Sequence, residues 1–143
     1  MNIISTDTYK IRFKDEGYAH INELVASKNY TNFYVLVDEN TKKLCLTTFK
    51  EKVSFKFEII EIKSGEIHKN LDTCLDVWNH LTNKNADRNS LLINLGGGVI
   101  TDMGGFIAST YKRGIDFVNI PTTLLSMVDA SIGSKTRNKR RIK

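Results

Sequence analysis

Leu91-Leu92-Ile93-Asn94-Leu95-Gly96-Gly97-Gly98-Val99-Ile100 is the stretch that decides the fold. Its first five residues form a short, mostly apolar run, which is typical of a strand buried on both faces of a sheet. The three glycines that follow allow a sharp turn, and a helix is predicted over residues 100–111. A strand, a glycine turn and a helix in this order indicate one unit of an α/β fold.

Short apolar runs alternate with amphipathic segments along the rest of the chain. Further strands are predicted at residues 34–37, 57–62 and 117–120. Helical spacing of apolar residues predicts one face with Tyr18, Ile21, Leu24 and Val25, and another with Leu71, Cys74, Leu75, Trp78 and Leu81. We therefore expect an open, mostly parallel, Rossmann-like α/β sheet flanked by helices, with ligands bound beyond the carboxyl ends of its strands.

The composition is that of a water-soluble globular domain. The chain has 143 residues, of which 41% are hydrophobic and 26% charged, so it can bury a core. No apolar run approaches the roughly 20 residues of a membrane span, and the N-terminus lacks the apolar stretch of a signal peptide. The two cysteines, Cys45 and Cys74, form no CxxC pair. We expect a cytoplasmic protein without membrane association.

The net positive charge of the chain comes from its C-terminal end. The formal net charge is +5, and the last seven residues, 137–143, hold five cations and no acid. The rest of the chain is therefore electrically neutral. A basic tail attracts phosphate backbones without sequence preference, but nothing upstream supplies a basic face or an aromatic platform. We expect no specific nucleic-acid partner.

The turn Gly96–Gly98 predicts an anion site. Glycine lets a ligand approach the main chain, and the helix that follows offers unpaired N–H groups at its N-terminus. Diphosphate suits such a turn, and a tight turn without a ligand is the alternative. Two further glycines inside the predicted helix, Gly104 and Gly105, indicate close packing against a neighbouring element.

Two better-known phosphate motifs do not fit the sequence. In the G-x-G-x-x-G motif an acid follows the glycines by about 20 residues, whereas here Asp38 precedes them. A Walker A loop needs glycine directly before its lysine, and Ser134 stands before Lys135. A P-loop nucleoside triphosphatase is therefore not expected.

Polar residues follow each of the other predicted strands. Asp38 and Asn40 suit ribose hydroxyls or an adenine edge, and a helix cap explains them equally well. Residues 64–69 follow the next strand, and Thr122 and Thr123 follow the last, where helix capping is again the alternative. Because the carboxyl ends of parallel strands meet at one edge of a sheet, a single ligand laid along that edge would touch all of them.

Three motifs together resemble those of the 3-dehydroquinate synthases. They are the glycine turn through Asp102, the block Ser109–Gly114, and the run Val118–Gly133 with its PTTLL-x-x-VD pattern. The similarity extends upstream through Val35–Asn40 and Gly65–Lys69, so it covers most of the chain. A sister sugar phosphate cyclase, such as a 2-deoxy-scyllo-inosose synthase, shares much of this pattern and is the alternative family.

The resemblance implies a lyase of the shikimate pathway to aromatic amino acids. This family converts a phosphorylated sugar acid, 3-deoxy-D-arabino-heptulosonate 7-phosphate, to 3-dehydroquinate and phosphate, with NAD as a recycled cofactor. Its N-terminal domain holds NAD, and a second, all-helical domain supplies a divalent metal, zinc or cobalt. The resemblance also implies a homodimer.

Matching motifs imply roles for individual residues. The implied cofactor-binding residues are Asp38, Asn40, Glu66, Lys69, Gly97, Gly98, Asp102, Thr122 and Thr123. The implied catalytic residues are Asp129, Lys135 and Arg113. Arg113 matches an arginine that reaches the substrate phosphate of the neighbouring subunit, a task suited to the bidentate guanidinium.

The sequence departs from the family pattern in two places. Ser134 stands where family members usually have glycine, and its side chain would crowd the backbone. After Thr136 the pattern stops, so we expect an NAD-binding domain at residues 1–136 and a separate basic tail at residues 137–143. The Glu and two His metal ligands of the family have no match, and we expect this chain alone to be inactive. A non-catalytic nucleotide-binding fragment is the alternative class.

Overall fold

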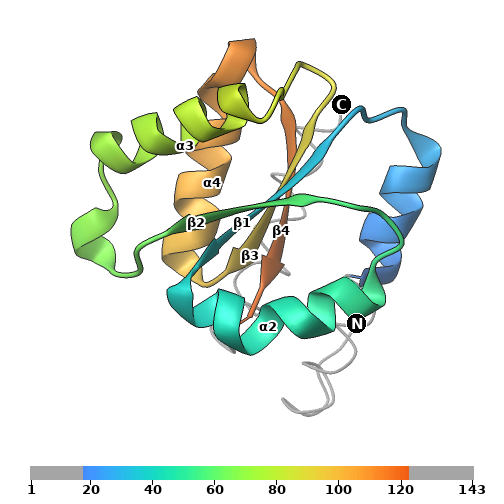
Figure 1. Ribbon diagram of the computed structural model, residues 1–143, viewed down its shortest axis with the longest axis horizontal. Coiled ribbons are helices and arrows are strands. Elements are labelled where there is room, and N and C mark those ends of the chain that lie inside the picture. The colour runs from blue at the N-terminus through green and yellow to red at the C-terminus, as the bar shows by residue number, and fades with distance from the viewer. Residues whose placement is uncertain (1–17, 123–143) are drawn as a thin grey trace, which may run out of the picture.

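Four parallel strands form the centre of the structure, a computed structural model that describes residues 18–122. The strands are β1 (Phe33–Asp38), β2 (Glu58–Ile62), β3 (Leu91–Gly96) and β4 (Asp116–Pro121). They lie in the order β2-β1-β3-β4, and every neighbouring pair is parallel (Figure 1). The predicted parallel α/β sheet is confirmed, and all four carboxyl ends lie at one edge.

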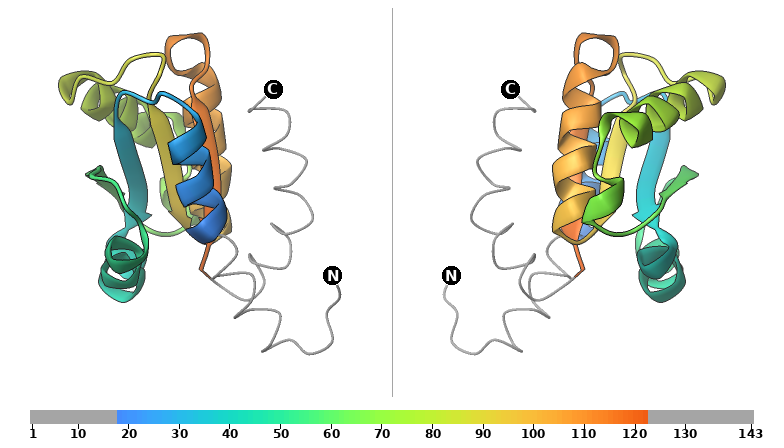
Figure 2. Two further views of the ribbon diagram at one scale, coloured as in Figure 1. Left: turned by 90° about the vertical axis from the view of Figure 1, so that its right-hand side faces the viewer. Right: turned by 90° about the vertical axis from the view of Figure 1, so that its left-hand side faces the viewer.

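Helices cover both faces of the sheet (Figures 1 and 2). The helix formed by residues 18–27 and α2 (Glu39–Lys52) pack on one face. The other face is covered by α3 (Leu71–Asn83) and α4 (Gly98–Thr110). Two short 3-10 helices, η1 (Glu66–His68) and η2 (Tyr111–Arg113), lie in the connections after β2 and α4.

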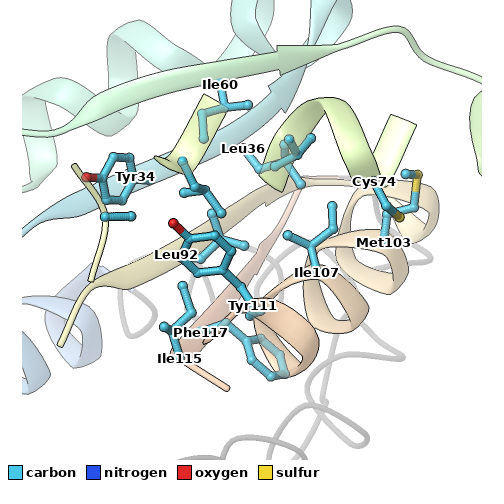
Figure 3. Close-up of a cluster of buried hydrophobic side chains, with 14 of the residues drawn as sticks. Tyr34, Leu36, Ile60, Cys74, Leu92, Met103, Ile107, Tyr111, Ile115 and Phe117 are labelled. Atoms are coloured by element: carbon cyan, nitrogen blue, oxygen red, sulfur yellow. The ribbon is translucent and has the colours of Figure 1, made fainter. Parts of the chain in front are cut away.

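Strand β3 contributes to both cores because successive side chains of a strand point to opposite faces. Leu91, Ile93 and Leu95 belong to the core beneath α2, and Leu92 belongs to the core beneath α3 and α4 (Figure 3). All six residues of the strand are buried, which explains why its sequence is almost continuously apolar. Asn94 interrupts this apolar run with a buried amide.

Strand β2 lies at an edge of the described sheet and has a different pattern. Ile60 and Ile62 are buried, while Glu58 and Glu61 are exposed. The charged residues that alternate with apolar ones also discourage pairing with another chain at this edge.

The predicted apolar face of α3 is wrong at two positions. Cys74 and Leu81 are buried as expected, but Leu71 and Leu75 are 66% and 51% exposed. Spacings of three and four residues fit two adjacent stripes on this helix, and α3 turns the stripe that contains Val77 toward the sheet. The other predicted helical face is confirmed, because Tyr18, Ile21 and Leu24 are buried together.

None of the helices between residues 18 and 122 combines the length and the apolar character that crossing a bilayer would require.

Candidate functional site

The strand order places a switch point between β1 and β3. From β1 the chain moves outward to β2, and then returns past β1 to reach β3 and β4. In open α/β sheets, ligands bind outside the carboxyl ends of the strands at such a point. Here the two strand ends that flank it carry Asp38 and the glycine turn.

The glycine turn leaves the start of α4 without a side-chain cap. Gly97 is the N-cap residue, and no side chain among the described residues accepts a hydrogen bond there. The first N–H groups of an α-helix have no partner within the helix, and they carry partial positive charge. A Cβ atom added to Gly98 would meet no other atom within 4 Å. The turn therefore combines free donors with open space, and it fits a diphosphate.

Two other glycines of this segment serve packing rather than binding. A Cβ on Gly96 would lie 2.7 Å from Ile100 Cγ1, and one on Gly104 would overlap the Asn94 side chain. A Cβ on Gly105 would meet only the Phe117 ring, at 3.5 Å, which is an ordinary contact. The predicted close packing is confirmed at Gly104 and is not required at Gly105.

Asp38 caps α2 at the carboxyl end of β1. Its Oδ1 accepts hydrogen bonds from the backbone N–H groups of Asn40, at 2.9 Å, and Thr41, at 2.8 Å. Thr41 Oγ1 accepts in turn from the Asp38 N–H at 3.0 Å, which completes a capping box. The capping interpretation of Asp38 is therefore confirmed. A carboxylate has further acceptor capacity, so the cap leaves room for a ribose hydroxyl. Asn40 is exposed in the first turn of α2.

Glu39 joins the end of β1 to the loop that follows β2. Its Oε1 accepts from the Ser64 N–H at 2.9 Å, and its Oε2 accepts from the Ser64 hydroxyl at 2.6 Å. The hydroxyl hydrogen bond, followed by backbone hydrogen bonds, holds the pKa of Glu39 below its usual value. This contact is not predictable from the sequence, because no local pattern indicates which residue of a distant loop faces a helix start.

Lys69 and Asp102, two of the implied cofactor residues, form an ion pair. Lys69 Nζ lies 3.3 Å from Asp102 Oδ2, and their side chains are 38% and 56% exposed. Lys69 follows η1, whereas Asp102 lies in the second turn of α4, so the pair links the β2 loop to the helix that begins at the glycine turn. Glu66, the first residue of η1, is exposed on the same loop.

Thr122 lies directly beside the glycine turn. Its backbone N–H donates to the Gly96 carbonyl at 3.2 Å, beyond the last paired residues of β3 and β4. It is the last residue that the structure describes; Thr123, Asp129, Ser134, Lys135 and the tail at residues 137–143 lie outside the described residues. The carboxyl edge thus presents the β2 loop, Asp38, the glycine turn and Thr122 in spatial order.

Arg113 lies at the opposite edge of the sheet. It ends η2, which connects the C-terminal end of α4 to the amino end of β4. The length of α4 separates it from the glycine turn by roughly 20 Å. Lys112 and Arg113 have φ values of 48° and 70°, a left-handed conformation that is uncommon for residues with a side chain. The Gly114 N–H donates to the Tyr111 carbonyl at 2.7 Å and helps to hold this turn.

The described residues offer no metal centre. Between residues 18 and 122, no group of three or more His, Cys, Asp or Glu side chains is placed to hold a metal ion. Zinc or cobalt, which the resemblance implies, does not fit this part of the chain.

A four-stranded parallel sheet with a glycine turn at its switch point defines a Rossmann-like α/β domain. Comparison with known sequences identifies the family more specifically than the fold does. Residues 59–143 match the family described as 3-dehydroquinate synthase N-terminal, and the chain belongs to this family. It is 43% identical over 119 residues to a 3-dehydroquinate synthase of Parabacteroides distasonis, a match that covers 82% of this chain and 34% of that protein. The chain spans about a third of the length of the curated relatives it matches.

Solved structures of sugar phosphate cyclases share the fold. A 2-epi-5-epi-valiolone synthase from Streptomyces hygroscopicus, with NAD+ and Zn2+ bound, superimposes with a TM-score of 0.64 and 29% identity, covering 77% of this chain and 31% of that chain. A 2-deoxy-scyllo-inosose synthase complexed with carbaglucose-6-phosphate, NAD+ and Co2+ gives a TM-score of 0.67 at 20% identity, covering 76% and 30%. These likenesses confirm the predicted fold class.

Proposed function

We propose that this chain binds NAD along the carboxyl edge of its sheet and forms the cofactor half of a 3-dehydroquinate synthase. The observation that carries the proposal is the uncapped glycine turn at the switch point, open above Gly98. Family membership and the NAD+ bound by the 29% identical 2-epi-5-epi-valiolone synthase support a dinucleotide as the ligand.

Different residues along this edge would bind the two halves of the dinucleotide. The N–H groups of Gly97 and Gly98 would donate to the diphosphate. Asp38 and Asn40 would accept ribose hydroxyls or meet the adenine, and Thr122 would lie toward the nicotinamide. The remaining proposed contacts are Glu66, Lys69 and Asp102 on the diphosphate flank and adenosine side, and Thr123 beside Thr122. When bound, NAD supplies a hydride acceptor that can return the hydride.

The reaction we propose for the complete enzyme is the conversion of 3-deoxy-D-arabino-heptulosonate 7-phosphate to 3-dehydroquinate and phosphate in the cytoplasm. Relatives named 3-dehydroquinate synthase at 43% identity favour this substrate over those of the sister cyclases. Asp129 and Lys135 are proposed to face substrate and nicotinamide. We assign no step to zinc or cobalt, because residues 18–122 hold no candidate ligand group.

A homodimer is the assembly we propose for the complete enzyme. The separation of Arg113 from the glycine turn of its own chain supports a role of this arginine toward the substrate phosphate of a neighbouring subunit. Residues 1–136 are proposed to form the NAD-binding domain, with the basic tail of residues 137–143 outside it.

We expect the 143-residue chain alone to give no turnover, which leaves binding without catalysis as its own activity. About two thirds of the length of its relatives has no counterpart in this match. Positioning of the reacting groups contributes up to about 7–11 kcal/mol to catalysis, and we expect the unmatched part of the relatives to supply much of it. An assay of phosphate release from the heptulosonate phosphate, with NAD and zinc or cobalt added, measures turnover by this chain. The full-length Parabacteroides enzyme is assayed beside it for comparison. Multiple turnovers by this chain would overturn the expectation.

Calorimetric titration of NAD into the wild-type chain and the Gly98→Val variant tests the proposed function. The variant should fold normally, because the added side chain starts in open space. It should bind NAD at least about tenfold more weakly, a change of about 1.4 kcal/mol, because the side chain occupies the place of the diphosphate. Equal affinities of the two proteins, or no binding by either at millimolar NAD, would refute the proposal.

A further inference from the structure

Two buried amides lie beneath the glycine turn, and the proposed function does not use them. Asn94 on β3 and Asn119 on β4 are register partners, and they are 0% and 7% exposed. Asn94 Nδ2 donates a hydrogen bond to Asn119 Oδ1 at 3.0 Å. This is a side-chain link between two strands that are otherwise joined by backbone hydrogen bonds.

Each amide also has one polar atom that pairs with none of the residues between 18 and 122. Asn94 Oδ1 and Asn119 Nδ2 are buried and make no hydrogen bond with any residue that the structure describes. Unpaired buried polar groups lower stability, and two apolar β-branched side chains would avoid this loss in a buried strand. A partly unpaired amide pair in a native core therefore needs an explanation other than stability.

The amide pair lies close along the two strands to the start of the glycine turn and to Thr122. Gly96 follows Asn94 by two residues, and Thr122 follows Asn119 by three. The strands stay in register through Gly96 and Pro121, and the Thr122 N–H then donates to the Gly96 carbonyl. The amide pair is thus placed to fix how the glycine turn stands relative to the end of β4.

Helix α4 rests on the same amide. A Cβ on Gly104 would overlap the Asn94 side chain, so glycine is required for the helix to approach β3 this closely. Because α4 begins at the glycine turn, the position of its first N–H groups depends on how the helix lies on Asn94.

We propose that Asn94 and Asn119 form a positioning pair that sets the spacing between the glycine turn and Thr122. This inference rests on the proposed function. The pair would set the distance between the groups that bind the diphosphate and the group that lies toward the nicotinamide half of NAD. A hydrogen bond has a narrow range of length and angle, whereas apolar contacts are non-directional. The amides therefore specify a geometry that an apolar pair would leave loose.

Valine substitutions separate positioning from stability. Asn94→Val and Asn119→Val each leave one amide without its partner, so each single variant should unfold at lower urea concentration than wild type. The double variant removes both amides and should recover stability, since no buried polar group is stranded. Its affinity for NAD should remain at least about fivefold weaker than that of wild type, while its affinity for ADP, which lacks the nicotinamide half, should stay within about twofold of wild type.

Val77→Ala is the matched control. It removes core volume from α3 in the core beneath α3 and α4, so it should lower stability while keeping the NAD-to-ADP affinity ratio.

Recovery of NAD affinity together with stability in the double variant would overturn the proposal. If the double variant does not fold, Asn119→Thr is compared with Asn119→Val. The threonine keeps an acceptor hydroxyl opposite Asn94, so its NAD-to-ADP affinity ratio should stay near that of wild type while the ratio of Asn119→Val falls, and equal ratios in the two variants would contradict positioning. If wild type binds neither nucleotide, the proposed function fails, and positioning is decided by amide NMR instead. The double variant should then shift the resonances of Gly98 and Thr122 but not that of Ser64, and unchanged Gly98 and Thr122 resonances would contradict positioning.

Discussion

Gly104 and Gly105 are neighbours in the sequence but have opposite steric surroundings. The sequence predicts close packing for both, because glycine is unfavourable inside a helix. Only the structure shows that Gly104 faces the Asn94 amide and that Gly105 faces the edge of the Phe117 ring at an ordinary distance. Which of two adjacent helix residues faces a strand depends on the rotation of the helix about its axis, and composition alone does not specify that rotation.

Alanine substitutions at the two glycines should have opposite effects on stability. Gly104→Ala forces α4 away from β3 and should cost about 1–3 kcal/mol, the usual range for overpacking a core. Gly105→Ala should be neutral or stabilise the protein by up to about 1 kcal/mol, because alanine favours the helix. Urea denaturation of the two variants measures both values, and equal destabilisation by both would show that the contact with Asn94 is not limiting.

At the scale of elements, the ends of β1 and β2 are tied together through Glu39 and Ser64. Both carboxylate oxygens of Glu39 accept hydrogen bonds from Ser64, so the carboxylate form is the one that holds the β2 loop. The pKa of Glu39 is lower in the folded protein than its usual value. The carboxylate therefore stabilises the fold at a pH above its usual pKa, and this stabilisation is lost as the pH falls through the lowered pKa.

Ser64→Ala should raise the pKa of Glu39 toward its usual value of 4.5, because the hydroxyl hydrogen bond is the largest cause of the shift. An NMR titration of the Glu39 side-chain carboxyl carbon measures the change, with Glu61, on β2, as the reference in the same spectrum. An unchanged Glu39 titration would mean that the hydroxyl does not hold this carboxylate in solution.

The ion pair between Lys69 and Asp102 should matter more for ligand binding than for folding. Both side chains are partly exposed, and exposed pairs stabilise proteins by at most about 1 kcal/mol. Lys69→Met should therefore change the free energy of unfolding by less than about 1 kcal/mol, yet it should weaken NAD binding because a cation beside the diphosphate is lost. Denaturation and calorimetry on the same preparation test both parts, and unaltered NAD affinity would remove Lys69 from the cofactor site.

At the scale of the whole molecule, the sequence predicts the elements well and their arrangement only in part. Buried strands such as β1 and β3 are continuous apolar runs, so their existence is readable from the residues. The order β2-β1-β3-β4 is set by which strands pair, and no local pattern records it. The predicted meeting of polar strand ends is confirmed because the sheet is parallel, whereas the position of Arg113 at the far edge follows from the direction of α4.

An amide NMR titration of the isotope-labelled 143-residue chain with NAD tests most directly whether a dinucleotide lies along the carboxyl edge of the sheet. We expect the largest shifts at Asn40, Gly98 and Thr122, which follow three different strands at that edge. The resonances of Asn85 and Arg113, which precede β3 and β4 at the opposite edge, should not move. Shifts confined to Asn85 and Arg113, or no shift at Gly98 at saturating NAD, would contradict the proposed site.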